Sequence, residues 1–83
     1  MKFAEIKTLN NVIEKLNTKL DSMQELMETR QFIFDERSDA WQESERGEIY
    51  AQGIEDISDQ IINVEEVIGM LEEAVSILEE NES

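Results

Sequence analysis

Apolar side chains recur at alternating steps of three and four residues through two long blocks of this chain. The first block comprises Ile6, Leu9, Ile13, Leu16, Leu20, Met23 and Met27, and its spacing continues through Arg30 to Phe34. The second comprises Tyr50, Ile54, Ile57, Ile61, Val64, Ile68, Leu71, Val75 and Leu78. Such a repeat places all members on one stripe of an α-helix, the seam of a coiled coil. Since the chain has no proline, the pattern predicts an all-α protein with two long helices.

The two blocks do not share one heptad register. Ile54 follows Trp41 by 13 residues, one fewer than two heptads. The intervening stretch is polar, and either Ser38 or Ser44 suits the N-cap of a second helix with acidic residues in its first turn. We therefore expect the chain to reverse direction between the blocks.

The expected fold is an antiparallel two-helix hairpin. Its single domain spans residues 1–83, with one helix over about 2–36, a turn within 35–45 and a second helix over about 45–81. The alternative is one continuous helix that dimerises in parallel with a local register defect.

Further apolar residues lie beside the seam and widen the apolar arc of each helix. They are Val12, Leu26 and Ile33 in the first helix and Ile62, Val67, Met70 and Ile77 in the second. One partner helix cannot cover so wide an arc. We therefore expect a homodimer in which two hairpins form a four-helix bundle. The alternative is that these residues dock another protein, which makes the chain a coiled-coil adaptor.

Two residues near the reversal have alternative roles. Trp41, the only tryptophan, is either an exposed anchor for a partner or an aromatic plug packed on Phe34 or Tyr50. Arg30 holds a seam position. It either pairs with a carboxylate across the interface or covers the seam with its stem while its head reaches water.

Charge is distributed very unevenly along the chain. The formal net charge is −14, yet residues 1–34 are balanced, and the eleven acidic residues of 47–83 have no Lys, Arg or His among them. Such a surface repels nucleic acid and anionic membranes and attracts basic surfaces. We therefore expect a protein partner that is basic, and no direct binding of nucleic acid or membrane.

The acidic residues of the second helix form a ladder with a seven-residue repeat, in which successive steps lie about 10.5 Å apart. The residues expected to bind a partner are Glu55, Asp56, Asp59, Glu65, Glu66, Glu72 and Glu73. An extended row of carboxylates resembles the phosphates of a nucleic acid, so we expect it to occupy a basic nucleic-acid-binding surface, for example of a nuclease or a defence complex. The alternative is a solvated face that only maintains solubility.

The composition of the chain argues against catalysis and against a specific metal site. The chain has no Cys and no His, so it lacks thiolate ligands, disulfides and the usual general base. Glu25–Glu28 and Glu36–Asp39 match the ExxE and ExxD words with which all-α nucleotide pyrophosphatases hold magnesium, but the second pair falls at the expected turn. We predict no catalytic, cofactor or specific metal site, and only loose binding of divalent cations by the glutamate pairs.

The location expected from the sequence is the cytoplasm. The charged N-terminus does not resemble a signal peptide, and no window approaches the roughly 18 apolar residues of a membrane span.

The stretch from Glu36 to Tyr50, with Trp41-Gln42-Glu43 at its centre, is similar to the turn region of small acidic helical proteins from bacteriophages and mobile elements. In size and charge the chain also resembles phage anti-defence proteins, including DNA-mimicking anti-restriction and anti-CRISPR inhibitors. This resemblance implies a non-enzymatic inhibitor acting in a bacterial host cell. The chain is also similar to the WXG family of secreted helical hairpins, although Glu43 stands where that family has glycine.

Overall fold

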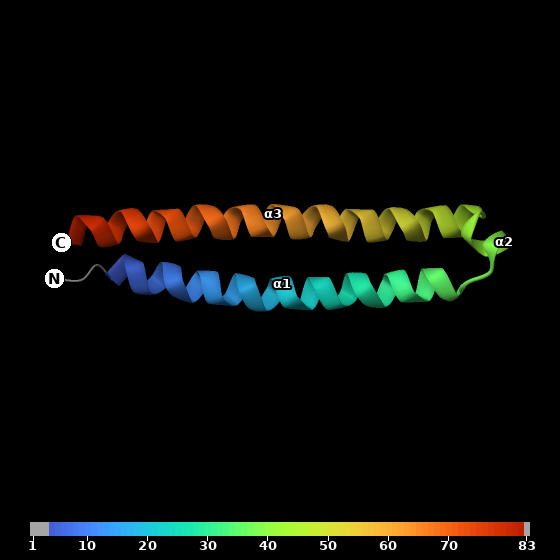
Figure 1. The fold of residues 1–83 in the computed structure, drawn as a ribbon, viewed down its shortest axis with the longest axis horizontal. Helices are drawn as coiled ribbons and strands as arrows, with labels where there is room; N and C mark the ends of the chain where they lie inside the picture. The colour runs from blue at the N-terminus through green and yellow to red at the C-terminus, as the bar shows by residue number, and fades with distance from the viewer. Residues whose placement is uncertain (1–3, 83) are drawn as a thin grey trace.

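The chain folds into a long antiparallel hairpin of two helices joined by a short helical turn (Figure 1). The computed structural model describes the backbone of residues 4–82 and the side chains of 4–81. The elements are α1 (Ala4–Glu36), α2 (Asp39–Gln42) and α3 (Glu45–Glu82). The hairpin measures 63 × 15 × 12 Å, and the start of α1 and the end of α3 lie at the end opposite the turn.

These bounds confirm the predicted hairpin and exclude one continuous helix. The reversal occupies residues 37–44, inside the predicted interval of 35–45. The expected start of the first helix at residue 2 lies outside the described residues.

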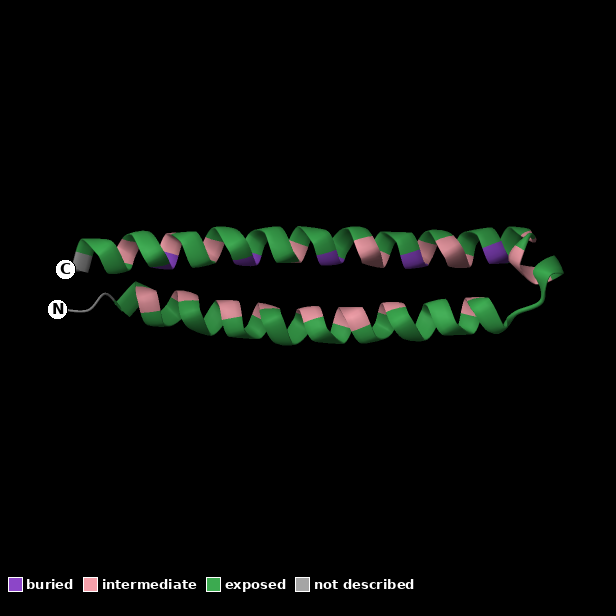
Figure 2. Cartoon of the chain, in the orientation of Figure 1, coloured by how far each residue is buried: buried purple, intermediate pink, exposed green. Residues whose placement is uncertain are grey.

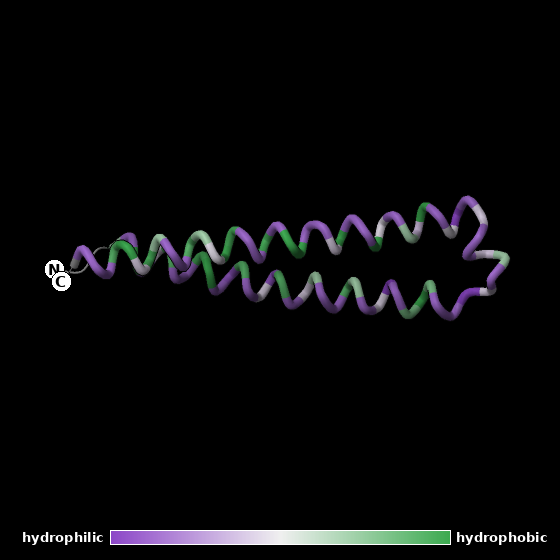
Figure 3. The backbone as a smooth tube through the Cα atoms, turned by 45° about the horizontal axis from the view of Figure 1, so that its top comes forward, coloured by the Kyte–Doolittle hydropathy of each residue, from purple (hydrophilic) through white to green (hydrophobic). Residues whose placement is uncertain are grey.

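The seam predicted from the sequence forms the contact between α1 and α3 (Figures 2 and 3). Ile54, Ile61, Ile68 and Val75 of α3 are 6–9% exposed. Their partners on α1 are only half-buried, and no residue of α1 is fully buried. Arg30 interrupts the apolar seam and is exposed, as expected if its charged head reaches water. The seam of α3 is therefore well covered by α1, whereas the seam of α1 is only partly covered by α3.

Two serines cap the two helices that follow them, so both proposed N-caps are used. The Ser38 side chain accepts a hydrogen bond of 3.2 Å from the Trp41 amide at the start of α2. The Ser44 hydroxyl accepts one of 3.2 Å from the Gly47 amide at the start of α3. These bonds satisfy amides that have no partner within their own helix.

The end of α1 is tied to the turn by the side chain of Gln42. Its amide nitrogen donates to the carbonyl oxygen of Phe34 at 2.9 Å and to that of Arg37 at 3.1 Å. The Phe34 carbonyl also accepts from the Arg37 amide at 3.1 Å. The last carbonyls of a helix lack intrahelical donors, so Gln42 supplies the C-terminal cap of α1.

An aromatic cluster closes the hairpin at its turn. Phe34 stacks on Tyr50 with 6.4 Å between ring centroids, and Trp41 meets both rings edge-on at 6.0 and 5.8 Å. The guanidinium of Arg37 lies 4.8 Å from the centre of the Trp41 ring. All three rings are half-buried. Trp41 is thus the aromatic plug that the sequence offered as one alternative, packed against both Phe34 and Tyr50.

We expect Trp41→Ala to destabilise the hairpin by about 2–3 kcal/mol, less than for a fully buried tryptophan, because the substitution removes two ring contacts and leaves a cavity. Urea denaturation followed by circular dichroism measures the change. The matched control is Phe32→Ala, since Phe32 is 65% exposed, and we expect it to change stability by less than about 0.5 kcal/mol. Equal effects of the two substitutions would show that the cluster does not stabilise the turn.

Candidate protein-binding faces

The hairpin has two broad faces, which the heptad positions flanking the seam define. In α3, position a is held by the buried Ile54, Ile61, Ile68 and Val75. In α1, it is held by every seventh residue from Ile6 to Phe34, namely Ile6, Ile13, Leu20, Met27 and Phe34. Positions e and b lie on one side of each seam, and positions g and c on the other. Because α1 and α3 are antiparallel, the e and b positions of both helices share one face, and their g and c positions share the other.

The seven acidic residues predicted to bind a partner are all exposed. We call them the acidic strip: Glu55, Asp56, Asp59, Glu65, Glu66, Glu72 and Glu73. Glu55, Glu65 and Glu72 hold b or e positions and lie on the first face, and Asp59, Glu66 and Glu73 hold f positions along its outer edge. Asp56 holds position c, so the helix turns it towards the second face. The structure therefore brings six of the seven residues together.

A second row of carboxylates, on α1, shares the first face with the acidic strip. Its residues occupy successive b positions and are all exposed: Glu14, Asp21, Glu28 and Asp35. This row was not among the residues predicted to bind a partner. Its seven-residue spacing was visible, but its place beside the α3 carboxylates depends on the antiparallel pairing of the helices.

Uncharged amide side chains separate the two acidic rows. The e positions of α1 are held by Asn10, Asn17, Gln24 and Gln31. Gln31 donates to the Asp35 carboxylate at 3.0 Å. No e position in either helix is occupied by a cation, so the first face presents carboxylates and amides along most of its length.

The second face is apolar. All seven residues predicted to widen the apolar arc are exposed, at 39–59%, which confirms that the hairpin alone does not cover them. Six of them hold g or c positions: Val12, Leu26, Ile33, Val67, Met70 and Ile77. Ile62 holds position b and lies on the first face. Ile49, 66% exposed at position c, extends the apolar face and was missed because it lies next to the turn.

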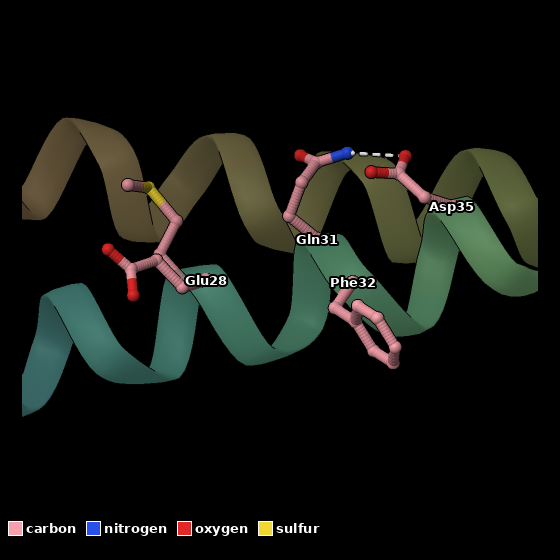
Figure 4. A pocket seen from close by; sticks show the side chains of 5 residues that line it. Glu28, Gln31, Phe32 and Asp35 are labelled. Carbon is pink, nitrogen blue, oxygen red and sulfur yellow. Dashed lines mark hydrogen bonds between the residues drawn. The ribbon is translucent and has the colours of Figure 1, made fainter.

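A shallow groove of about 350 Å³ lies on α1 near the turn. Its lining residues are Met27, Glu28, Gln31, Phe32 and Asp35 (Figure 4). Phe32, 65% exposed, projects outward beside the hydrogen-bonded pair of Gln31 and Asp35. One wall therefore offers carboxylates and the other an exposed ring, a combination that suits a cationic side chain.

Among side chains 4–81, no group of three or more His, Cys, Asp or Glu is placed to hold a metal ion. Glu36 ends α1 whereas Asp39 begins α2, so the two acidic residues of the ExxD word lie on different helices.

Glu43 stands at the turn, where the WXG family has glycine. Glu43 has φ −83° and ψ −8°, a conformation open to any residue. The chain therefore turns here without the glycine that the WXG motif supplies.

No helix within the described residues is long and apolar enough to cross a membrane. Comparisons with protein families, curated proteins and solved structures found no match to this chain.

Proposed function

We propose that this protein is a non-enzymatic inhibitor that binds, through its acidic strip, a basic surface with which another protein holds nucleic acid. The observation that carries the proposal is that every residue of the strip is exposed, on a helix without a positive charge from Gly47 onward. The second carboxylate row on α1 supports it, because both rows present negative charge to the same side.

The charge density supports a likeness to nucleic acid. A net charge of −14 over a length of 63 Å corresponds to one negative charge per about 4.5 Å. One strand of duplex DNA carries one per about 3.4 Å. A groove lined with Lys and Arg would gain similar electrostatic attraction from either ligand.

Affinity capture from a bacterial lysate, with elution by rising salt, tests the proposal. We expect a nucleic-acid-binding protein to elute as salt rises, because screening weakens contacts between exposed charges. Reversal of four strip residues to Lys is expected to abolish its capture: Glu65, Glu66, Glu72 and Glu73.

A matched control reverses four exposed carboxylates that lie outside the strip, the α1 row and the apolar face, which changes the net charge equally: Glu25, Asp39, Glu43 and Glu45. We expect this variant to keep most of the binding. Circular dichroism confirms that both variants remain helical. Capture that survives reversal of the strip, or that both variants lose equally, would contradict the proposal.

The exposed apolar face supports a second candidate, a coiled-coil adaptor that binds another protein through apolar contacts. A partner held by this face resists salt and is lost when Val67, Met70 and Ile77 are replaced by polar residues, whereas charge reversal leaves it bound. We also propose that two hairpins pair into a four-helix bundle, because α1 is left without a fully buried residue.

A further inference from the structure

The apolar face is the one extended surface of the hairpin that carries balanced charge. Its g and c positions hold three acidic residues, Glu5, Glu36 and Asp56, and three basic residues, Lys15, Lys19 and Arg46. The e and b positions of the opposite face combine nine carboxylates with only Lys7. Those nine are Glu14, Asp21, Glu28, Asp35, Glu48, Glu55, Glu65, Glu72 and Glu79.

This segregation selects how two copies can approach each other. Two acidic faces repel, and so do an acidic face and the outer edge of α3, which carries Asp59, Glu66 and Glu73. Two apolar faces bring together neutral surfaces and remove exposed aliphatic side chains from water. Self-association is therefore favourable through only one of the two broad faces.

The exposed area of the hairpin is large enough to supply such an interface. The chain exposes 6391 Å², whereas a globular monomer of 9.7 kDa exposes about 5,100 Å². The excess, about 1,300 Å², is larger than the roughly 800 Å² that each partner buries in a standard interface.

Two symmetric arrangements bring the apolar faces together. With the turns at opposite ends, α3 lies along the partner's α3, and two helices that lack positive charge after Gly47 run side by side. With the turns at the same end, α1 lies along the partner's α3. Since the apolar face of α1 carries Lys15 and Lys19, the second arrangement places positive charge beside the acidic α3 of the second copy.

The register of the hairpin identifies the segment of α3 that the lysines of α1 approach. Phe34 stacks on Tyr50, and both helices rise by about 1.5 Å per residue. Lys15 and Lys19 therefore lie level with residues 65–69 of α3. In a dimer with both turns at one end, they lie level with the same segment of the second copy's α3, which carries no positive charge.

We propose that the apolar face binds a second copy of this chain, in a two-fold symmetric four-helix bundle with both turns at the same end. Val67, Met70 and Ile77 then pack against α1 of the partner, and both acidic faces remain on the outside. This inference deepens the proposed pairing of hairpins. It does not depend on what the acidic strip binds, because oligomeric state and lysate capture are measured separately.

Light scattering after size-exclusion chromatography, across a wide range of concentration, tests the interface. We expect a dimer whose dissociation constant rises at least about 100-fold in the double variant Val67→Gln, Met70→Gln, with helicity retained, because both residues are exposed in the hairpin itself. The control Ile62→Gln replaces a residue that is 58% exposed on the opposite face and should leave the dimer intact. A monomer at every concentration, or a dimer that tolerates the double variant, would overturn the proposal.

A single spin label per subunit tests the orientation. The chain has no cysteine, so Asp39→Cys in the exposed turn provides one attachment site. With the turns together, the two labels are separated by about the width of the bundle, roughly 20–30 Å for helices 10–12 Å across. With the turns apart, they are separated by a distance close to the hairpin length of 63 Å. The shorter distance supports the proposed dimer, and the longer one overturns its orientation.

Discussion

Gly47→Ala is expected to destabilise the hairpin by about 3 kcal/mol, the upper end of the usual range for overpacking. Gly47 is buried in the first turn of α3 and holds a seam position. A methyl group there would lie 2.5 Å from the Gln42 carbonyl oxygen and 2.7 Å from its carbon, and it would also meet the Trp41 carbonyl oxygen. These atoms belong to the backbone, so no side-chain rotation relieves the overlap.

We expect Gly47→Ala to disturb the Ser44 cap and the Trp41 ring as well. The Ser44 hydroxyl accepts from the Gly47 amide and donates to the Trp41 carbonyl. If the turn backbone moves to make room for a methyl group, this cap and the position of the Trp41 ring change with it. We therefore expect a loss of the near-ultraviolet dichroism of Trp41 along with the loss of stability.

Two other glycines provide controls of the same chemical change. Beyond the neighbouring residues and the backbone of its own helix, a methyl group at Gly53 or Gly69 meets no atom within 4 Å. Both lie inside α3, where alanine is favoured over glycine by about 0.5–1 kcal/mol. Urea denaturation at one protein concentration should thus show stabilisation by Gly53→Ala and Gly69→Ala. Stabilisation by Gly47→Ala as well would contradict the close packing of the turn.

Ile61→Ala is expected to destabilise the protein by about 3 kcal/mol, within the range of 2–5 kcal/mol for buried isoleucine. Ile61 is 6% exposed in the centre of the seam. Truncation of its side chain leaves a cavity between α1 and α3 that two straight helices cannot readily close. The midpoint of urea denaturation measures the effect.

Its neighbour in sequence is the control. Ile62→Ala removes the same atoms as Ile61→Ala, but the Ile62 side chain is 58% exposed. We expect a change of less than about 0.5 kcal/mol, because little apolar area returns to water and alanine is the better helix former. Similar effects at residues 61 and 62 would show that the helix does not present the face that the heptad pattern assigns to it.

Much of the fold was predictable because its signals are local. The seam residues, the reversal within 35–45 and the two serine caps follow from spacing and residue type over short stretches. The sequence left Trp41 open between an anchor and a plug. Its contacts with Phe34 and Tyr50 required the end of α1 and the start of α3 to be placed together.

The candidate faces were only partly predictable. The acidic strip and most of the apolar surplus are visible in one helix at a time, since each follows from the position of a residue relative to its own seam. Ile49 was missed because it precedes the second block, and Phe32 because its f position lies opposite the seam.

The sequence by itself determined that this protein forms two long helices with apolar seams, and that α3 is acidic. Heptad spacing acts through the geometry of a single helix, so no further information is needed. The tertiary structure decided which residues of the two helices share a face. Only the antiparallel pairing sets Glu14, Asp21 and Glu28 beside the α3 carboxylates and gathers the exposed aliphatic side chains on the opposite side.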